Sequence, residues 1–398
     1  MRDRFDFTTE LSENVRSRFF IGGEWRQPLS DERLELVSPL TEQVMTTLPG
    51  GSAADMDAAI AAARTAFDDG PWPRMSPAER GEVIRRIGQE VQNRLDSLSR
   101  VWTAQVGVTQ GFNQMVTGLV PAYFDYFANL ASTYAFEELR PTAQGHARIV
   151  REAVGVCALV LPWNAPLVLL SQKLAAALLA GCTIVTKPSP ETPFDALILA
   201  ECAEKAGLPA GVFNVVPAGR EAGDALIRDP RVDKVSFTGS TDAGRHIGAV
   251  CADRVARCSL ELGGKSAAII CDDANLAEAI PALVPVAIPF SGQICFSQTR
   301  LLVSEQRHDE VMDALRTAVS GVAMGDPWDE QTMIGPLSMA RQRDRVLGYI
   351  EKAQAEGATL VHRGGNGGFN LGYFVEPTIF DDVTPDMAIA QEEVFGPV

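Results

Sequence analysis

Residues 154–186, VGVCALVLPWNAPLVLLSQKLAAALLAGCTIVT, decide how this chain folds. Residues 154–161 form a short apolar run that is typical of a buried strand, and two prolines and an asparagine interrupt the pattern after it. Residues 167–179 have the length and composition of a buried helix, which ends at Gly181. Residues 183–186 repeat the strand pattern. A strand, a helix and a second strand in this order indicate a parallel sheet.

The same alternation continues along the chain. The pattern predicts a helix at 194–206, a strand at 213–216, a short helix at 221–227, a strand at 234–237, a helix after Ser240 and a strand at 259–262. A second alternating unit follows, with strands at 267–270 and 300–303 and helices at 308–322 and 342–355. Such alternation predicts mostly parallel sheets with helices on both faces. We therefore predict the α/β class with two doubly wound parallel-sheet domains.

The first half of the chain adds helices and an arm. Small strands are expected within residues 17–48, and Ser52 and Ser76 each precede a helical apolar pattern. Three aromatic residues near position 125 are expected in the core. Residues 133–153 are polar and β-prone, so we expect strands that leave the main body. They form either an arm that pairs with another subunit or a surface hairpin.

Composition restricts the partners. The chain has 398 residues, of which 46% are hydrophobic, and a formal net charge of −16, which disfavours nucleic acid and anionic membranes. The uncharged run 153–172 is too interrupted by proline to be a membrane span, and the N-terminus lacks a signal peptide. The seven cysteines form no CxxC pair, so we expect reduced thiols, no metal site and a cytoplasmic protein.

Ligands of parallel sheets bind where the strands end at their carboxyl termini. The loop FTGSTDAG, residues 237–244, follows a strand and begins a helix, a context that suits phosphate. It lacks the middle glycine of the dinucleotide fingerprint, in which Glu261 would be the ribose ligand. Gly264-Lys265-Ser266 is no P-loop, because Ser259 stands where that motif needs glycine. The glycine-rich segment 364–368 is expected to be a turn.

One cysteine stands apart from the others. Cys295 lies among small and polar residues in SGQICFSQTR, residues 291–300, directly after an apolar run. A reactive thiol needs access, nearby donors and a lowered pKa. A buried, unreactive cysteine is the commoner case, and the stretch alone favours it.

Six motifs in order resemble one family. They are PWN at 162–164, TKPS at 186–189, FTGSTDAG at 237–244, LELGGKS at 260–266, GQICFSQTR at 292–300 and EEVFGPV at 392–398. Together they resemble the aldehyde dehydrogenase superfamily, of the non-phosphorylating NAD(P)-dependent type. The resemblance covers nearly the whole chain, and it reverses the interpretation of Cys295.

The resemblance implies four catalytic residues. Cys295 matches the nucleophile that attacks the aldehyde, and Asn164 matches a donor to the oxyanion. Glu261 matches the general base that activates water, which favours a free acid as product over a coenzyme A thioester. Lys187 is also counted with this group, although its implied contact is with the adenine ribose. Ala165 and Phe296, beside Asn164 and Cys295, suggest a roomy apolar pocket.

The resemblance also implies a cofactor site. Its residues are Trp163, Lys187, Ser189, Gly239, Ser240, Leu262, Glu393 and Phe395. NAD-preferring members often carry glutamate three residues after the matching lysine, whereas this chain has Pro190, and Glu191 is expected to point elsewhere. We expect NAD, with NADP as the alternative.

The resemblance assigns roles to the parts of the chain. Residues 1–128 and 151–262 are expected to form a Rossmann-like NAD(P)-binding domain, residues 129–150 an oligomerisation arm, and residues 263–398 a catalytic domain. Family members continue beyond EEVFGPV, so we expect the polypeptide to extend past Val398 and the catalytic domain to be incomplete here. The expected substrate is a small-molecule aldehyde, and the expected assembly is a homodimer or homotetramer. The alternatives are a catalytically silent relative with a structural role and a coenzyme A-acylating relative.

Overall fold

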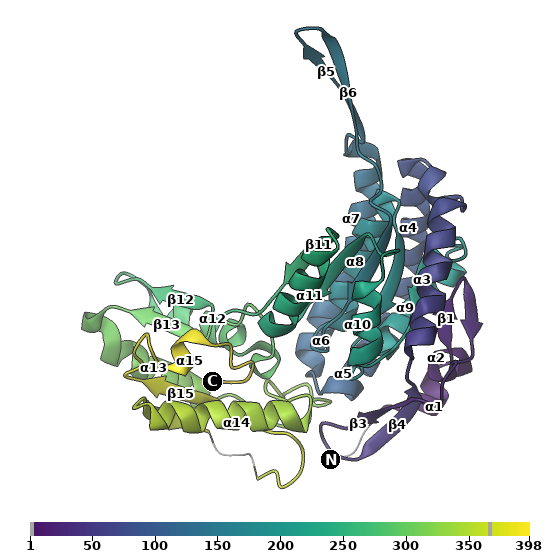
Figure 1. The fold of residues 1–398 in the computed structure, drawn as a ribbon. Coiled ribbons are helices and arrows are strands. Elements are labelled where there is room, and N and C mark those ends of the chain that lie inside the picture. Colours follow the sequence, from purple (N-terminus) through teal and green to yellow (C-terminus); the bar gives the residue numbers. More distant parts are fainter. Residues whose placement is uncertain (1–3, 365–367) are drawn as a thin grey trace.

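The computed structural model describes residues 4–364 and 368–398 (Figure 1). Three residues of the predicted glycine turn at 364–368 therefore lie outside the described residues. The centre of the first half is a seven-stranded sheet in the order β11-β10-β7-β8-β9-β1-β2. Its parallel strands are β7 (Val156–Val160), β8 (Thr183–Lys187), β9 (Phe213–Val215), β10 (Lys234–Thr238) and β11 (Arg257–Glu261). At one edge β1 (Phe19–Ile21) pairs antiparallel with β9, and β2 (Glu24–Arg26) pairs antiparallel with β1.

Two hydrophobic cores cover the two faces of this sheet. Along β7, Leu159 faces one core while Ala158 and Val160 face the other, as the alternation of side chains along a strand requires. The helices α3 (Ala53–Asp68), α10 (Arg220–Arg228) and α11 (Thr241–Asp253) pack against one face of the sheet. The other packs α4 (Pro77–Asn93), α5 (Leu95–Val106), α7 (Val120–Thr133), α8 (Pro166–Ala180) and α9 (Phe194–Lys205). The predicted parallel sheet with helices on both faces is confirmed.

Local signals set where the helices begin and end. Ser52 and Ser76 both form capping boxes. In each, the serine side chain accepts the backbone N–H of an acidic residue three positions on, and the side chain of that acid accepts the backbone N–H of the serine. The helix α8 ends at Gly181, whose φ of 89° is left-handed and favours glycine. Of the three aromatic residues expected in the core, Phe124 is buried and Phe127 packs on the core, but Tyr126 is 61% exposed. That part of the prediction is wrong because Tyr126 lies on the solvent side of α7.

A two-stranded hairpin projects from the body, as Figure 1 shows. Its strands are β5 (Glu137–Thr142) and β6 (Gly145–Val150), within the segment where strands leaving the body were expected. Arg148 bridges the two strands to Glu137, with Nη2 at 2.7 Å from the carboxylate. Leu139 on this hairpin is 71% exposed.

The second half of the chain forms a smaller α/β unit. Its elements are β12 (Ala267–Ile270), α12 (Leu276–Ala287), β13 (Arg300–Val303), α13 (His308–Ser320), α14 (Ala340–Ala355), β14 (Thr359–Arg363), β15 (Thr378–Asp381) and α15 (Ala388–Gln391). The strands β12 and β13 are parallel, whereas β14 and β15 are antiparallel. The described strands thus form two separate pairs and no single doubly wound sheet. The segment 321–339 after α13 contains two prolines and three glycines, which are residues that disfavour a strand.

Short elements complete the first half. They are α1 (Phe7–Glu10), α2 (Glu13–Ser17), α6 (Gln110–Thr117) and the hairpin of β3 (Arg33–Val37) and β4 (Val44–Pro49).

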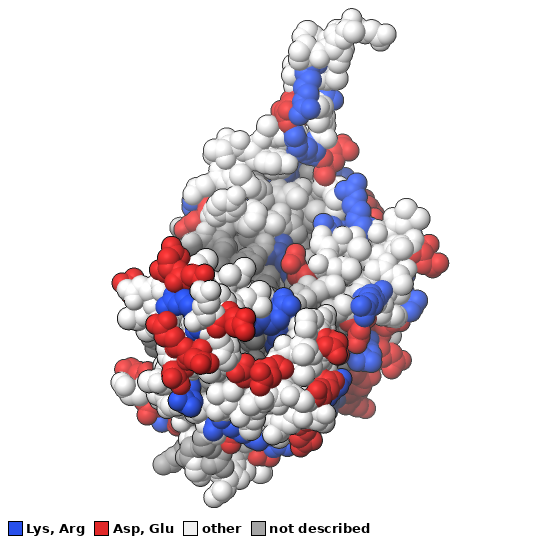
Figure 2. Space-filling model, turned by 90° about the vertical axis from the view of Figure 1, so that its left-hand side faces the viewer, with Lys and Arg blue, Asp and Glu red and all other residues white. Residues whose placement is uncertain are grey.

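No helix in the described ranges is long and apolar enough to cross a membrane. Figure 2 shows basic and acidic side chains interspersed over one face, which is hollowed near its middle.

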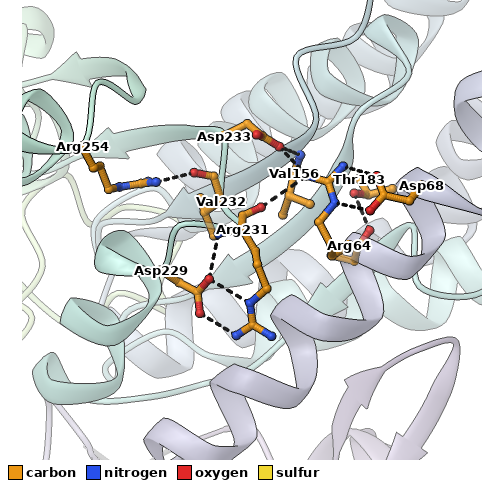
Figure 3. A network of polar contacts seen from close by, with 10 residues as sticks. Arg64, Asp68, Val156, Thr183, Asp229, Arg231, Val232, Asp233 and Arg254 are labelled. Atoms are coloured by element: carbon orange, nitrogen blue, oxygen red, sulfur yellow. Dashed lines mark hydrogen bonds and ion pairs between the residues drawn. The ribbon is translucent and has the colours of Figure 1, made fainter.

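A polar network closes the amino ends of the parallel strands (Figure 3). Asp233 accepts the backbone N–H of Val156 at 2.7 Å, and Arg64 pairs with the same carboxylate at 2.8 Å. Gly155, with a φ of 124°, packs so close that a Cβ there would overlap the Asp233 carboxylate. The amino edge of the sheet is therefore filled by structural contacts, and the carboxyl edge is the side where ligands of parallel sheets bind.

One carboxyl group is buried in the core beside the sheet. Asp195, in the first turn of α9, is fully buried, and its Oδ2 accepts the Gln105 side-chain N–H at 2.7 Å. Its Oδ1 has no hydrogen-bond partner among the described residues. Burial raises the pKa of Asp195 to about 7, above its ordinary value of 3.8.

This carboxyl makes stability depend on pH. The folded protein holds the Asp195 proton up to about pH 7, whereas the unfolded chain releases it near pH 4, so stability falls as pH rises between these values. We expect Asp195→Asn, which keeps an acceptor for Gln105, to be more stable than the parent at pH 8 by on the order of 2–4 kcal/mol. The two should be similar at pH 4. Urea unfolding across this range measures the difference.

The matched control is Asp125→Asn, in an exposed side chain of α7. It should leave the pH dependence of unfolding unchanged. An equal gain for Asp195→Asn at pH 4 and pH 8 would contradict a buried neutral carboxyl.

Candidate active site

The loop after β7 contacts the loop that carries Cys295. Asn164 is buried at the carboxyl end of β7, and its Nδ2 donates to the backbone oxygen of Gln293 at 2.9 Å. Gln293 is itself fixed, because its side-chain oxygen accepts the backbone N–H of Ser338 at 3.0 Å. An amide nitrogen has two N–H donors, so this bond orients the Asn164 amide and leaves one donor for the site.

The chain is strained immediately before Cys295. Phe290, Ser291 and Gly292 have consecutive positive φ angles of 47°, 55° and 76°. Such a conformation costs of order 1–3 kcal/mol for each residue other than glycine, and it persists only where the surroundings enforce it. Here Ser291 donates its hydroxyl to the Gly335 oxygen at 2.9 Å. A Cβ on Gly292 would overlap the backbone of Gly396, so only glycine allows the loop to lie against the last described segment of the chain.

Cys295 follows this strained turn and is exposed. Although the residue as a whole is exposed, neighbouring atoms partly bury its sulfur. This partial burial is the largest influence on the thiol and raises its pKa, and repulsion from Glu393 and Glu261 raises it further. Hydrogen bonds from the backbone N–H groups of Cys295 and Phe296 oppose the rise. The free protein therefore holds the Cys295 thiol above its ordinary pKa, first because the sulfur is partly buried and second because two carboxylates lie near it.

Glu261 ends β11 and is exposed. Its backbone oxygen accepts the N–H of Gly239 at 3.0 Å, which ties together the loops after β10 and β11. The following glycines allow a second carboxylate to approach, because a Cβ on Gly263 would overlap the Glu393 side chain. Two carboxylates from distant segments therefore flank the cysteine.

Glu393 is held from two sides. Arg345 donates to its backbone oxygen at 2.8 Å, and the backbone N–H of Gly264 bonds to its carboxylate. Burial raises the pKa of Glu393. Its Oε1 is buried and accepts no hydrogen bond within the described part of the chain. A buried acceptor without a donor marks a position where a ligand hydroxyl would fit.

Trp163 and Phe395 meet beside this carboxylate. Their rings are perpendicular, with centroids 5.3 Å apart. Phe395 has a φ of 61°, and Gln342 Nε2 donates to its backbone oxygen at 2.8 Å. The aromatic pair thus joins the loop after β7 to the segment 392–398.

Lys187 lies at the end of β8, away from the cysteine. Its Nζ donates to the backbone oxygens of Pro188 at 3.0 Å and Ala218 at 3.2 Å. Burial lowers its pKa to about 8. These two backbone oxygens hold the Lys187 ammonium in one position, where it could bind a ligand. The catalytic role that the resemblance implies for Lys187 stays a prediction.

The residues after Lys187 are engaged with one another. Ser189 donates its hydroxyl to Glu191, and Arg341 pairs with the same carboxylate. Glu191 is thus held by Ser189 and Arg341, and its charge also acts on Lys187 at the end of β8, where it opposes the lowering of the Lys187 pKa. Pro190 lies between Ser189 and Glu191 and offers no N–H or side-chain acceptor.

The loop after β10 begins a helix. Ser240 caps α11 by accepting the N–H of Ala243 at 3.4 Å, and Gly239 precedes it. Leu262 packs so closely on Gly244 that a Cβ there would overlap it at 2.5 Å. The structure therefore brings the sequence-predicted residues of four loops to the carboxyl edge of the sheet.

Several residues that hold the site in place carry no signal in the sequence. Trp102, buried in α5, donates its indole N–H to the backbone oxygen of Asn164 at 2.8 Å. Gln342 donates to the backbone oxygen of Phe395 at 2.8 Å, and Arg345 donates to the backbone oxygen of Glu393 at 2.8 Å. No local pattern marks these residues, because each acts on a segment far along the chain.

Two apolar residues, Phe296 and Ala165, are the sequence neighbours of Cys295 and Asn164. Phe296, next to Cys295, is 59% exposed, and Ala165 packs against the cluster of Trp102 and Phe290. No group of three or more residues that could bind a metal ion occurs in the described ranges.

The comparisons with known proteins agree with this geometry. A model of the aldehyde dehydrogenase family matches residues 25–398. Geranial dehydrogenase from Castellaniella defragrans is 42% identical over 381 residues, which are 95% of this chain and 80% of that protein. 3-succinoylsemialdehyde-pyridine dehydrogenase from a Pseudomonas species is 40% identical over 96% of this chain and 80% of its own length.

Two solved structures are also similar. A Mycobacterium tuberculosis aldehyde dehydrogenase complexed with NAD+ has a TM-score of 0.93 and 43% identity, over 96% of this chain and 80% of its own. A mutant of aldehyde dehydrogenase C from Pseudomonas syringae, in complex with NAD+ and octanal, has a TM-score of 0.93 and 37% identity, over 97% and 79% of the two chains. The chain therefore belongs to the aldehyde dehydrogenase family.

Proposed function

We propose that this protein oxidises an apolar organic aldehyde to the free carboxylic acid, with NAD as the oxidant and Cys295 as the nucleophile. The observation that carries the proposal is the bond from Asn164 Nδ2 to the Gln293 oxygen, because it sets an amide donor beside the cysteine loop. The proposed division of labour assigns cofactor binding to residues 1–128 and 151–262 and catalysis to residues 263–398.

In the first step the Cys295 sulfur, as thiolate, attacks the aldehyde carbon. A carbon–sulfur bond forms, and the carbonyl electron pair moves to the oxygen, which gives a thiohemiacetal anion. The free N–H of the Asn164 amide and the backbone N–H of Cys295 are the proposed donors to this oxyanion. Donors that are already oriented contribute most here, since removing one typically costs 10²–10³ in kcat.

The residues at the carboxyl edge fit a dinucleotide. The unpartnered Oε1 of Glu393 is an acceptor for a ribose hydroxyl, and the buried Lys187 ammonium is a donor at the far end of the same edge. Trp163, Ser189, Gly239, Ser240, Leu262 and Phe395 complete the proposed contacts. When bound, NAD supplies the hydride acceptor that turns the thiohemiacetal into a thioester.

Glu261 is the proposed base for hydrolysis. It is exposed at the end of β11, so water reaches its carboxylate. The carboxylate removes a proton from water, the resulting hydroxide attacks the thioester carbonyl, and the carbon–sulfur bond breaks to release the acid. This route needs no coenzyme A.

The proposed substrate class follows from the approach to the cysteine. Phe296 is largely exposed there, and an exposed aromatic ring favours an apolar aldehyde. Two relatives support this class, since one is named for geranial and another was crystallised with octanal. NAD is proposed over NADP on the NAD+ complexes of similar structures, while Pro190 is the residue that leaves NADP as the alternative.

The hairpin of β5 and β6 is the proposed contact between subunits. Leu139 and Val150 are exposed on it, and an unpaired strand edge is a ready site for pairing. A homodimer or homotetramer built through this arm is the proposed assembly.

The first test is an initial-rate survey with an octanal-type and a small polar aldehyde, each with NAD and with NADP. We expect NAD to be preferred. We also expect kcat/KM to be at least about 10-fold higher for the apolar aldehyde than for the polar one, because burial of additional methylene groups in an apolar pocket gives discrimination of at least this size. A large preference for NADP would reverse the cofactor assignment. Absence of oxidation with every aldehyde would favour the catalytically silent alternative.

The second test separates the two halves of the reaction. Cys295→Ala should lose activity at least about 10³-fold, because the nucleophile is gone, while Cys271→Ala, another exposed cysteine, should be normal. Glu261→Gln should still give a rapid burst of NADH, followed by turnover about 10²–10⁴-fold slower than normal. Stopped-flow absorbance follows both phases. Rescue of Glu261→Gln by coenzyme A, with a thioester product, would support the acylating alternative.

The third test concerns the thiol. Because the Glu393 charge contributes to the raised pKa of Cys295, Glu393→Gln should lower that pKa and speed alkylation by iodoacetamide at pH 8 without cofactor. Glu392→Gln is the matched control, since Glu392 is exposed and bonds to Tyr349 at 2.5 Å. Equal alkylation profiles in both variants and the parent would contradict the electrostatic coupling.

A further inference from the structure

We propose that Trp102 is a positioning residue, which holds the backbone of Asn164 so that its side-chain amide meets the oxyanion. The inference rests on the proposed function. Trp102 is 1% exposed in α5, and its Nε1 donates to the Asn164 oxygen at 2.8 Å across 62 residues of sequence. It therefore touches the backbone of the donor residue, and it does not touch the reacting atoms.

The same indole also contacts the cysteine side of the site. Its ring lies edge-on to Phe290, with centroids 6.1 Å apart and planes at 73°. Phe290 is the first of the three residues with positive φ before Cys295. Phe112 lies beside both rings, with centroids 6.3 Å from Trp102 and 6.4 Å from Phe290.

These contacts belong to one small apolar cluster. It joins Phe290 and Ile294 on the cysteine loop to the two neighbours of Asn164 in sequence, Trp163 and Ala165. Trp102 is the member that adds a hydrogen bond to this packing. One side chain therefore fixes the distance between the segment that carries the amide donor and the segment that carries the nucleophile.

The bond to the backbone oxygen is what gives the amide its direction. Asn164 lies between β7 and α8 in a loop where Ala165 has φ −136° and ψ 59°, outside regular structure. Its Nδ2 reaches the Gln293 oxygen only if the backbone keeps its present orientation. Without a donor the buried Asn164 oxygen would seek another partner, at a cost of about 1–3 kcal/mol, and the backbone would turn. A misplacement of about 1 Å is enough to cost a large factor in rate.

The chain offers a matched control in Trp72. Trp72 is likewise fully buried, but its Nε1 has no hydrogen-bond partner in the described part of the chain. Replacement of tryptophan by phenylalanine removes ring volume at position 72 and at position 102. It removes a hydrogen bond only at position 102. The difference between the two variants therefore reports the bond.

The experiment measures kcat and kcat/KM for an apolar aldehyde, the dissociation constant of NAD and unfolding in urea. We expect Trp102→Phe to lower kcat and kcat/KM about 10-fold, with NAD binding within about 2-fold of the parent, because only the oxyanion donor is disturbed. Trp72→Phe should lose stability through its ring volume alone, with kcat within about 2-fold of the parent. An equal loss of kcat in both variants would overturn the proposal.

A double-mutant cycle tests whether Trp102 acts through Asn164. Trp102→Phe introduced into Asn164→Ala should change kcat by less than about 2-fold, because the donor that it positions is already absent. If its full effect persists there, Trp102 acts by another route and the proposal fails. Inactivity of the parent protein would instead refute the proposed function.

A shape-conserving replacement covers the case in which Trp102→Phe does not fold. Benzothienylalanine at position 102 keeps the two-ring shape but has sulfur in place of the N–H. We expect a folded protein with the same fall in kcat, and a loss of stability no larger than that of the missing hydrogen bond, about 1–3 kcal/mol. Full activity of this variant would show that packing alone holds Asn164.

Discussion

The hydrogen bond between Asn164 Nδ2 and the Gln293 oxygen is the contact on which the rest of the site depends. It spans 129 residues of sequence and joins the carboxyl end of β7 to the loop that precedes Cys295. The large sheet determines one partner, and the smaller unit determines the other. The two units therefore have to fold against each other before a donor and a nucleophile can face the same substrate, and Trp102 fixes the donor side of that contact.

The cysteine loop is held in place against its own preference. Two residues other than glycine adopt left-handed angles before it, which costs energy that only surrounding contacts can offset. Those contacts come from the Gly335 oxygen, from Ser338 and from the backbone at Gly396. The segment 392–398 therefore has two effects, since it braces the loop and also brings the Glu393 charge, which adds to the rise in the Cys295 pKa that burial causes.

The sequence predicted what is local and missed what is distant. The capping serines at 52 and 76 and the strand pattern at 154–161 act within one turn or one strand, so their consequences could be inferred correctly. The motif residues were found through resemblance, because neither composition nor spacing alone distinguished Cys295 from a buried thiol. The raised thiol pKa and the bond from Trp102 could not be predicted, since both depend on segments that meet only in the folded chain. The separate strand pairs of the second unit were missed for a related reason, because pairing depends on which strands become neighbours.

Stability and chemistry lie at opposite edges of the central sheet. At the amino edge Asp233 bonds to Arg64 and to the β7 backbone, and Gly155 leaves no free space beside it. Among the described residues at the carboxyl edge, Glu393 keeps an oxygen without a hydrogen-bond partner, Lys187 donates to two backbone oxygens and Cys295 stays exposed. A parallel sheet makes this separation natural, because all its strands end on the same side. The unsatisfied groups can persist at that edge because the opposite edge, together with the two cores, stabilises the fold that presents them.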